Sequence, residues 1–301
     1  MMKAWNEKIL VLVVTWNGSA VIRRCLDSLR RSTIPVVTYV VDNNSEDDTV
    51  EVIQQNYPEV MLRANSGNIG FGQANNIGFD YAIGNGFDYV MMLNQDTYIE
   101  PDAIQKLVDA HLRNPGFGML SPMHYKAEGR LDDNFYRYVL EGCGHLVHDL
   151  LVRSSCIREV YPCGFVNAAA WLLSIDCIKK VGGFNPVFFH SGEDVDYYNR
   201  MDFGGFGTGV VFDAVIYHTR SNWGRLKGYA NLYFHRYVHY QVALLDPRHE
   251  YTLGMVTRTL LKEAFCQSVF GRWNDSKETI RIAFKLWKKR KGLLEAKNRK
   301  V

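Results

Sequence analysis

The sequence predicts an α/β fold in which helices cover a mostly parallel sheet. Short apolar runs alternate with segments of helical periodicity through the first hundred residues, and parallel strands need a crossover connection, which is usually a helix. Ligands bind outside the carboxyl ends of such strands. Clusters of polar residues stand directly after the apolar runs and so predict the position of a binding site: Thr15-Trp-Asn17, Asp42-Asn-Asn44, Asn65-Ser-Gly-Asn68 and Asn94-Gln-Asp96.

Each expected element follows from its local pattern. Residues 9–14 form a continuous apolar run, which is typical of a strand buried on both faces. Further strands are expected at 36–41, 60–63, 89–93, 166–175 and 210–217, and helices at 19–29, 50–55, 72–83, from Pro101 onward, 176–181, 193–202 and 277–292. Residues 123–163 show no assignable pattern, and from residue 228 the chain is expected to be helical and unusually aromatic.

Composition limits the class of protein. The 301 residues, 47% of them hydrophobic, suffice for one large α/β domain with an appendage or for two domains. The net charge of +3 gives no general signal for a polyanion, and no nucleic-acid partner is expected. The six cysteines contain no CxxC pair, which indicates reduced thiols. Neither a signal-peptide pattern nor a run of roughly 18 apolar residues is present, so a cytoplasmic location is expected.

Two carboxylates stand at the ends of expected strands. Asp42 can accept a hydrogen bond from a base or a ribose, or it can be an ordinary turn residue. Asp96 suits a divalent cation whose other ligands are water and diphosphate oxygens, or it can cap the following helix. The segment Gly70-Phe-Gly72-Gln-Ala-Asn75 begins like a dinucleotide-binding motif, but it lacks the third glycine and follows the third strand. A nicotinamide or flavin cofactor is therefore not expected.

Glu193, Asp194 and Asp196 crowd the expected start of a helix. They gain from the positive end of the helix dipole, and crowded carboxylates also raise one another's pKa, which suits a general base. Arg200 stands four residues after Asp196 and is expected to pair with it across one helical turn, which leaves Asp194 more available. His218 closes the strand at 210–217 and is either a packed residue or a metal ligand.

In this order the segments resemble the family 2 inverting glycosyltransferases of the GT-A fold, and most of all their bacterial rhamnosyltransferase and galactofuranosyltransferase branch. The resemblance covers about residues 8–220 and rests on Val13-Val-Thr15-Trp-Asn17-Gly18, Val41-Asp42-Asn43-Asn44-Ser45, Asn68-Ile-Gly70-Phe-Gly72-Gln-Ala74-Asn75-Asn76-Ile-Gly78, Leu93-Asn94-Gln95-Asp96, Gly182-Gly183-Phe184, Phe188-Phe189, Glu193-Asp194-Val-Asp196 and His218. It implies a Rossmann-like, mostly parallel sheet flanked by helices. The implied GT-A domain spans 1–225, with a nucleotide-sugar half at about 1–122 and an acceptor half at about 123–225, and a helical region follows at 226–301.

The resemblance also implies a role for each matching residue. Asp194 would be the general base that deprotonates an acceptor hydroxyl. Glu193, Asp196 and Trp171 would line the acceptor side, although core packing is an alternative for Trp171. Asp96 and His218 would hold a Mg2+ or Mn2+ ion that bridges two phosphates. The nucleotide-sugar side would consist of Thr15, Asn17, Asp42, Asn43, Asn68, Gly70, Asn75, Asn94, Gln95 and Asp96.

The implied reaction moves a sugar from a nucleoside-diphosphate sugar, such as dTDP-rhamnose or a UDP-sugar, to a hydroxyl of a glycan or lipid-linked acceptor in cell-surface polysaccharide synthesis. Inversion is a single in-line displacement, so one carboxylate and one metal ion are the minimum equipment. Two alternatives stay open. A sugar-nucleotide nucleotidyltransferase would want a basic residue in the loop after the first strand, and a non-catalytic carbohydrate-binding protein would not need Asp96, Asp194 and His218.

The C-terminal region lies outside the resemblance. Residues 277–291 form a basic amphipathic helix with Ile280, Phe284 and Trp287 on one face. This helix is expected either to lie on the inner face of the cytoplasmic membrane, where a lipid-linked acceptor would be found, or to dock its apolar face on the domain. The aromatic residues at 229–240 are expected to serve core packing or the contact of a homodimer.

Overall fold

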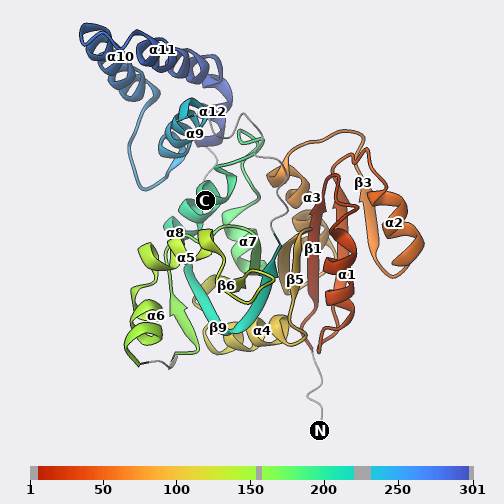
Figure 1. The fold of residues 1–301 in the computed structure, drawn as a ribbon. Helices are drawn as coiled ribbons and strands as arrows, with labels where there is room; N and C mark the ends of the chain where they lie inside the picture. Colours follow the sequence, from red (N-terminus) through yellow and green to blue (C-terminus); the bar gives the residue numbers. More distant parts are fainter. Residues whose placement is uncertain (1–5, 154–157, 220–231, 298–301) are drawn as a thin grey trace.

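A single mixed sheet lies at the centre of the molecule, with helices on both of its faces. Figure 1 shows the computed structural model, which describes residues 6–153, 158–219 and 232–297. The strands are β1 (Ile9–Thr15), β2 (Val37–Asp42), β3 (Met61–Ala64), β4 (Tyr89–Asn94), β5 (Thr97–Ile99), β6 (Phe117–Tyr125), β7 (Val160–Pro162), β8 (Ala170–Ser174) and β9 (Gly207–His218). They follow the order β3-β2-β1-β4-β8-β6-β9-β5, and β7 pairs with β9.

The two halves of the sheet differ in strand direction. The pairs β2–β3, β1–β2 and β1–β4 are parallel, as predicted. Beyond β4 the sheet is mixed, because β8 is antiparallel to both β4 and β6, while β9 is parallel to β6 and antiparallel to β5 and β7. The α/β fold class is therefore confirmed, but the expectation of a mostly parallel sheet is correct only for the part formed by β3, β2, β1 and β4.

Alternate residues of the buried strands point to two separate apolar clusters. Val11 of β1 packs with α1 and α4, while Leu12 packs with α3, α7 and α8 on the opposite face. The helices before residue 204 are α1 (Ile22–Arg30), α2 (Thr49–Asn56), α3 (Phe71–Gly84), α4 (Ala103–Arg113), α5 (Asp133–Gly142), α6 (Gly144–His148), α7 (Ile175–Val181) and α8 (Glu193–Phe203). The strands and helices expected up to residue 93 are all present, with ends that differ by at most three residues.

The segment without an assignable pattern consists of short elements. α5, α6, one turn of π-helix (Asp149–Arg153) and β7 pack on β6 and β9 around Phe135 and Tyr161, both of which are fully buried. Such short elements have too few residues to show a clear periodicity. The same reason explains why the three-residue strand β5, just before the predicted helix, was not expected.

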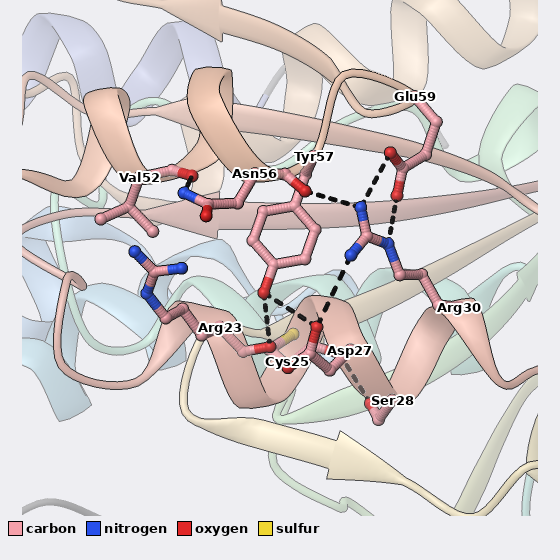
Figure 2. A network of polar contacts seen from close by, with 9 residues as sticks. All are labelled: Arg23, Cys25, Asp27, Ser28, Arg30, Val52, Asn56, Tyr57 and Glu59. Carbon is pink, nitrogen blue, oxygen red and sulfur yellow. Dashed lines mark hydrogen bonds and ion pairs between the residues drawn. The ribbon is translucent and has the colours of Figure 1, made fainter.

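A network of polar contacts joins α1 to the end of α2 (Figure 2). Tyr57, at the end of α2, donates to Asp27 Oδ1 at 2.9 Å, and burial raises the pKa of Tyr57 to about 12. Arg30 of α1 donates from Nε to Glu59 Oε1 at 2.6 Å and from Nη2 to Glu59 Oε2 at 3.0 Å. Exposed ion pairs contribute only about 0–1 kcal/mol, so this network mainly fixes how α1 and α2 lie together.

The C-terminal helices α9 (Leu232–Leu245), α10 (Leu253–Val269), α11 (Trp273–Lys288) and α12 (Arg290–Lys297) share a core cluster of their own. Phe188, in the loop before α8, joins this cluster and connects it to the sheet domain. The expected boundary at residues 225 and 226, and Tyr229 of the aromatic stretch, lie outside the described residues. Among the helices that the structure describes, none is both long enough and apolar enough to cross a bilayer.

Candidate active site

A cleft of about 670 Å³ opens at the carboxyl ends of β1 and β4 and extends to the first turn of α8. Its position agrees with the rule that ligands bind at this edge of an α/β sheet. Most of the residues predicted from the sequence line it, namely Thr15, Asn43, Asn68, Gly70, Asn94, Gln95, Asp96, Glu193, Asp194 and His218. The structure therefore brings together residues from six different segments of the chain.

The Gln95 side chain closes one end of the cleft by joining β4 to β1. Its Oε1 accepts from Trp16 N at 3.1 Å and from Thr15 Oγ1, and its Nε2 donates to Trp16 O at 3.1 Å. Gly18 makes room for this arrangement, since a Cβ there would lie 2.2 Å from Gln95 Oε1. The amide of Gln95 thus holds the Thr15 loop in place at the edge of the sheet.

Two asparagine side chains join the end of β2 to the loop before α3. Asn43 Nδ2 donates to Asn68 Oδ1 at 3.0 Å, and Asn43 Oδ1 accepts from Ile69 N at 3.0 Å. Asn68 Oδ1 also accepts from Gly70 N at 2.9 Å. Gly70 has a φ of +86°, and a Cβ at this position would lie 2.2 Å from Phe189 O. Glycine is required here because the backbone conformation and the close approach both exclude a side chain.

Three residues expected on the nucleotide side lie beside the cleft and are not on its wall. The Asp42 carboxylate is 1% exposed and accepts from Ser45 N at 2.9 Å and from Ser45 Oγ at 2.5 Å. Asn17 Oδ1 accepts from Glu46 N at 2.8 Å, and Asn75 Nδ2 donates to Phe71 O at 2.9 Å. Short polar side chains readily satisfy nearby backbone groups. Here Asp42 and Asn17 hold loops at the edge of the sheet, and Asn75 bonds within the first turn of α3.

Two residues expected on the acceptor side are structural. Trp171 is 1% exposed, its Nε1 donates to Val166 O at 3.1 Å, and its ring packs near Tyr197. β8 turns this side chain into the core, as the core-packing alternative predicted, and Trp171 is not among the residues that line the cleft. Asp196 is 2% exposed and accepts from Arg200 Nε at 2.9 Å, as the spacing predicted. This pair lies within α8, and Asp196 is not among the residues that line the cleft. Arg200 also donates to Val181 O and Gly183 O, and these bonds join α8 to the end of α7.

Glu193 and Asp194 begin α8 and line the cleft together. Burial raises the pKa of Asp194, and hydrogen bonds from backbone amides, including Val195 N at 2.9 Å, oppose that rise. Burial and then the charge of Asp194 raise the pKa of Glu193 to about 8. Glu193 is only 6% exposed, and its Oε2 has no hydrogen-bond partner among the described residues. At neutral pH the structure therefore favours a protonated Glu193 beside an Asp194 that can take up a proton.

Asp96 and His218 meet because β5 and β9 are antiparallel, with Thr97 opposite His218. His218 Nε2 lies 3.2 Å from Asp96 Oδ1. Two neighbouring ligands of an octahedral ion, each bonded at about 2.1 Å, stand roughly 3 Å apart, so this pair fits the coordination of Mg2+ or Mn2+. In the described parts of the chain no cluster of three or more metal-binding side chains occurs. Further ligands would have to come from a substrate or from water.

Several wall residues were not assigned from the sequence. Phe189 and Trp16 are 59% and 41% exposed and place aromatic surface on the cleft. Both stand within segments that carried the family resemblance, and this was the one feature of the sequence that could have marked them as cleft residues. Asn167, Ala168, Ala169 and His190 also line the cleft, but no sequence pattern marks them, because their place depends on how the strand β8 and the loop before α8 approach β4.

The sheet topology, with a cleft that joins β1, β4 and the start of α8, is that of the GT-A fold. Residues 10–157 match the family described as Glycosyl transferase family 2. The match covers just under half of the chain, and over these residues the chain is similar to the family 2 glycosyltransferases.

Its relatives include the N-acetylglucosaminyl-diphospho-decaprenol L-rhamnosyltransferase of Mycobacterium tuberculosis, which is 27% identical over 238 residues, covering 72% of this chain and 78% of that protein.

Solved structures support the fold. TarS 1–349 of S. aureus in complex with UDP-GlcNAc superimposes with a TM-score of 0.58 at 16% identity, covering 80% of this chain and 66% of that one. GalNAc-T7 with UDP, GalNAc and Mn2+ gives a TM-score of 0.60 at 13% identity, covering 79% of this chain and 48% of that one. The chain thus spans less than two thirds of each of these solved structures. At these identities the likeness shows the GT-A fold alone.

Proposed function

We propose that the protein transfers a sugar from a nucleoside-diphosphate sugar to a hydroxyl of a glycan or lipid-linked acceptor, with inversion, in cell-surface polysaccharide synthesis. The observation that carries this proposal is that one cleft contains Asp194 from α8 and the Asp96–His218 pair from β5 and β9. A base for the acceptor and a cation site for the leaving diphosphate are the two groups that such a displacement needs.

The donor is a dTDP-sugar or a UDP-sugar that binds between β1, β2 and the start of α3. Thr15, Asn43 and Asn68 place polar side chains on this part of the wall. The name of the Mycobacterium tuberculosis rhamnosyltransferase supports a rhamnosyl donor and a lipid-linked acceptor, so dTDP-rhamnose, which the family resemblance implied, is the first donor to test. The TarS complex supports UDP-GlcNAc as the second.

Asp96 and His218 would hold a Mg2+ or Mn2+ ion. When bound, such an ion neutralises the charge that develops on the departing diphosphate. The Mn2+ in the GalNAc-T7 complex supports this assignment. Asn94 stands nearby on the wall as a neutral residue, so Asp96 supplies the only formal negative charge among the residues 94–96.

Asp194 is the general base of the proposed reaction. It removes the proton of the acceptor hydroxyl while the oxygen forms a bond to the anomeric carbon and the bond from that carbon to the diphosphate breaks. The raised pKa of Asp194 favours proton uptake in the transition state. Glu193, protonated at neutral pH, can donate a hydrogen bond to a sugar hydroxyl. Phe189 offers an exposed ring on which the apolar face of a sugar can stack.

The test is a donor screen with and without Mn2+, followed by Asp194→Asn on the active pair of substrates. We expect transfer to fall by at least about a thousandfold, within the range assigned to a positioned acid or base, while nucleotide affinity changes little. Asp213→Asn, at an exposed position on β9, is the matched control. Transfer that survives in Asp194→Asn would show that this residue is not the base.

The released product distinguishes the proposed glycosyltransferase from the main alternative, a nucleotidyltransferase. A glycosyltransferase releases a nucleoside diphosphate, whereas a sugar-nucleotide nucleotidyltransferase releases pyrophosphate. No lysine or arginine is among the residues that line the cleft in the described structure, and this favours the glycosyltransferase, because triphosphate sites commonly use such residues. Detection of pyrophosphate in place of nucleoside diphosphate would support the alternative.

A lipid-linked acceptor places the reaction at a membrane surface. We therefore propose that the enzyme works as a peripheral protein on the inner face of the cytoplasmic membrane, without a spanning helix in the described part of the chain. The C-terminal helices are the region through which this contact is made. A homodimer is the competing use of the same helices, and the experiment described below distinguishes the two.

A further inference from the structure

The helices α10 and α11 form an antiparallel hairpin that packs on α9 (Figure 1). Ser276 Oγ donates to Ala264 O at 2.8 Å and Thr279 Oγ1 donates to Gln267 Oε1 at 3.0 Å, so small polar groups join the two helices closely. Arg236 of α9 pairs with Glu263 at 2.7 Å. The side of the hairpin that carries Glu263 therefore faces α9.

The opposite side of the hairpin is apolar and exposed. On α11 the exposed apolar residues stand at helical spacing, while Ile282, Ala283 and Leu286 are the ones buried against the other helices. The expectation that Ile280, Phe284 and Trp287 dock on the domain is therefore wrong. We use the term hairpin face for the following residues, with their exposed fractions: Leu261 53%, Phe265 70%, Phe270 79%, Trp273 63%, Ile280 49%, Phe284 63% and Trp287 51%.

Both helices contribute to this one surface. Leu261 and Phe265 of α10 line the same open groove as Trp287 of α11. Successive residues of a helix are rotated by about 100° about its axis. In two antiparallel helices, the residue that follows a contact residue therefore points to the same side of the pair on both helices. Leu261 and Phe265 each follow a buried residue of α10, and Ile280 and Phe284 each follow a buried residue of α11, so all four point to the same side. The apolar stripes of the two helices thus form a continuous patch that points away from α9.

A rim of cations surrounds the hairpin face. Arg258 and Lys262 stand beside it on α10, and Lys277 and Lys288 stand beside it on α11, all exposed. The guanidinium of Arg290 lies 4.0 Å from the centre of the Trp287 ring. The nearby acids are paired as well: Asp275 with Arg272, the residue just before α11, and Glu278 with Arg281 of α11. The net charge around the apolar centre is therefore positive.

We propose that the hairpin face docks on an anionic lipid bilayer, with its aromatic side chains in the headgroup region and its lysines and arginines against the lipid phosphates. An apolar face with a cationic rim is the pattern of helices that lie in a membrane interface, and tryptophan at its edge suits the boundary between chains and headgroups. The inference extends the membrane contact proposed above, but it does not depend on the sugar-transfer assignment.

A bilayer fits this surface better than a second copy of the chain does. In a two-fold symmetric dimer the same patch meets itself, so the cationic rims of the two copies would be brought together. Like charges within a Debye length, about 8–10 Å at ordinary ionic strength, repel one another. Anionic headgroups supply the opposite charge over the whole rim, and each basic residue adds to the attraction.

The docked hairpin is attached to the active-site wall through α9. Val238 of α9 packs so closely on the loop before α8 that a Cβ at Gly192 would lie 2.7 Å from its Cγ1. Phe188 of that loop is buried in the C-terminal cluster, and the adjacent Phe189 and His190 line the cleft. The wall that carries Asp194 is thus attached to the docking unit, which suits an acceptor that stays in the membrane.

The test is co-sedimentation of the full chain with vesicles of phosphatidylcholine alone and of phosphatidylcholine with phosphatidylglycerol. We expect binding to the anionic vesicles, weaker binding to the neutral ones, and loss of both in F265E/W287E. The variant K277Q/K288Q should lower the affinity for anionic vesicles by roughly tenfold or more and leave binding to neutral vesicles nearly unchanged. Leu112→Glu, at an exposed apolar position of α4, is the control and should bind like the unchanged protein.

Circular dichroism confirms that each variant is folded, and transfer to a water-soluble acceptor should be retained by all of them. Unchanged vesicle binding in F265E/W287E would overturn the proposal. Absence of binding to anionic vesicles in the unchanged protein would overturn it as well. If light scattering then shows a dimer that F265E/W287E converts to monomers, the hairpin face is the dimer contact. Loss of transfer activity in Asp194→Asn with normal vesicle binding separates this inference from the proposed function.

Discussion

Asp96 Oδ1 lies 3.2 Å from His218 Nε2, although the two residues come from distant parts of the sequence. The antiparallel pairing of β5 with β9 creates this contact. One carboxylate and one imidazole supply only two ligands, whereas Mg2+ takes six in an octahedral arrangement. The protein alone therefore offers an incomplete site, which a diphosphate can complete.

We expect Mn2+ to bind weakly to the protein alone and at least about tenfold more tightly when a nucleoside diphosphate is present, because affinities of two ligands at one site are coupled reciprocally. Isothermal titration calorimetry with and without UDP or dTDP measures this change. Asp96→Asn and His218→Ala should each remove the coupling, while Asp213→Asn should retain it. Tight Mn2+ binding that nucleotide does not alter would contradict the divided site.

The Glu193 carboxyl should make the stability of the fold depend on pH. Its pKa is raised from 4.5 to about 8 in the folded protein, chiefly by burial. The neutral form is favoured in the fold, so its contribution to stability is complete below about pH 4.5 and is lost as the pH rises to about 8. Glu193→Gln stays neutral at all pH values. The free energy of unfolding of the variant should therefore rise relative to that of the unchanged protein, by on the order of a few kcal/mol between pH 5 and 8.5.

Thermal unfolding of both proteins at pH 5, 7 and 8.5 measures this difference. Glu51→Gln, on the exposed side of α2, is the control for the loss of an exposed carboxyl group. A constant difference between Glu193→Gln and the unchanged protein would mean that Glu193 ionises in its ordinary range, and that it is not a hydrogen-bond donor in the cleft at neutral pH.

The sequence was sufficient to predict the strands β1, β2 and β4, because each is an apolar run that ends in polar residues of the cleft. It could not predict the antiparallel direction of β8, since strand direction depends on the path of the chain between strands. Asp42 illustrates a second limit. A turn residue and a ligand-binding residue have the same sequence context, and only the two bonds from Ser45 show that the Asp42 carboxylate holds a loop.

The aromatic residues Trp171 and Phe189 should affect different quantities. Phe189 is exposed on the cleft, so Phe189→Ala should raise KM for the acceptor several-fold and leave the melting temperature nearly unchanged. Trp171→Phe leaves Val166 O without its buried partner and should cost about 1–3 kcal/mol of stability, with little effect on KM. Steady-state kinetics and thermal unfolding of both variants decide the assignment. An effect of Trp171→Phe on acceptor KM alone would restore the role first expected for Trp171.

Gly18 should be required because of the Gln95 side chain. An alanine Cβ at position 18 would lie 2.2 Å from Gln95 Oε1 and 2.7 Å from Thr15 Oγ1. Gly18→Ala should therefore displace the Gln95 amide, break its bonds to Thr15 and Trp16, and cost about 1–3 kcal/mol, as overpacking commonly does. Since the displaced loop forms one end of the cleft, KM for the nucleotide sugar should also rise.

A double-mutant cycle tests whether the contact with Gln95 causes the loss of stability in Gly18→Ala. Gln95→Ala removes the nearer of the two side chains that the new Cβ would strike and frees Thr15 Oγ1 from its hydrogen bond to Gln95. The loss of stability in the double variant G18A/Q95A should therefore be smaller than the sum of the two single losses. Gly67→Ala is the matched control, because its Cβ would meet no atom within 4 Å. Additive losses in the cycle would show that Gly18 is needed for the loop itself, and that Gln95 does not determine its shape.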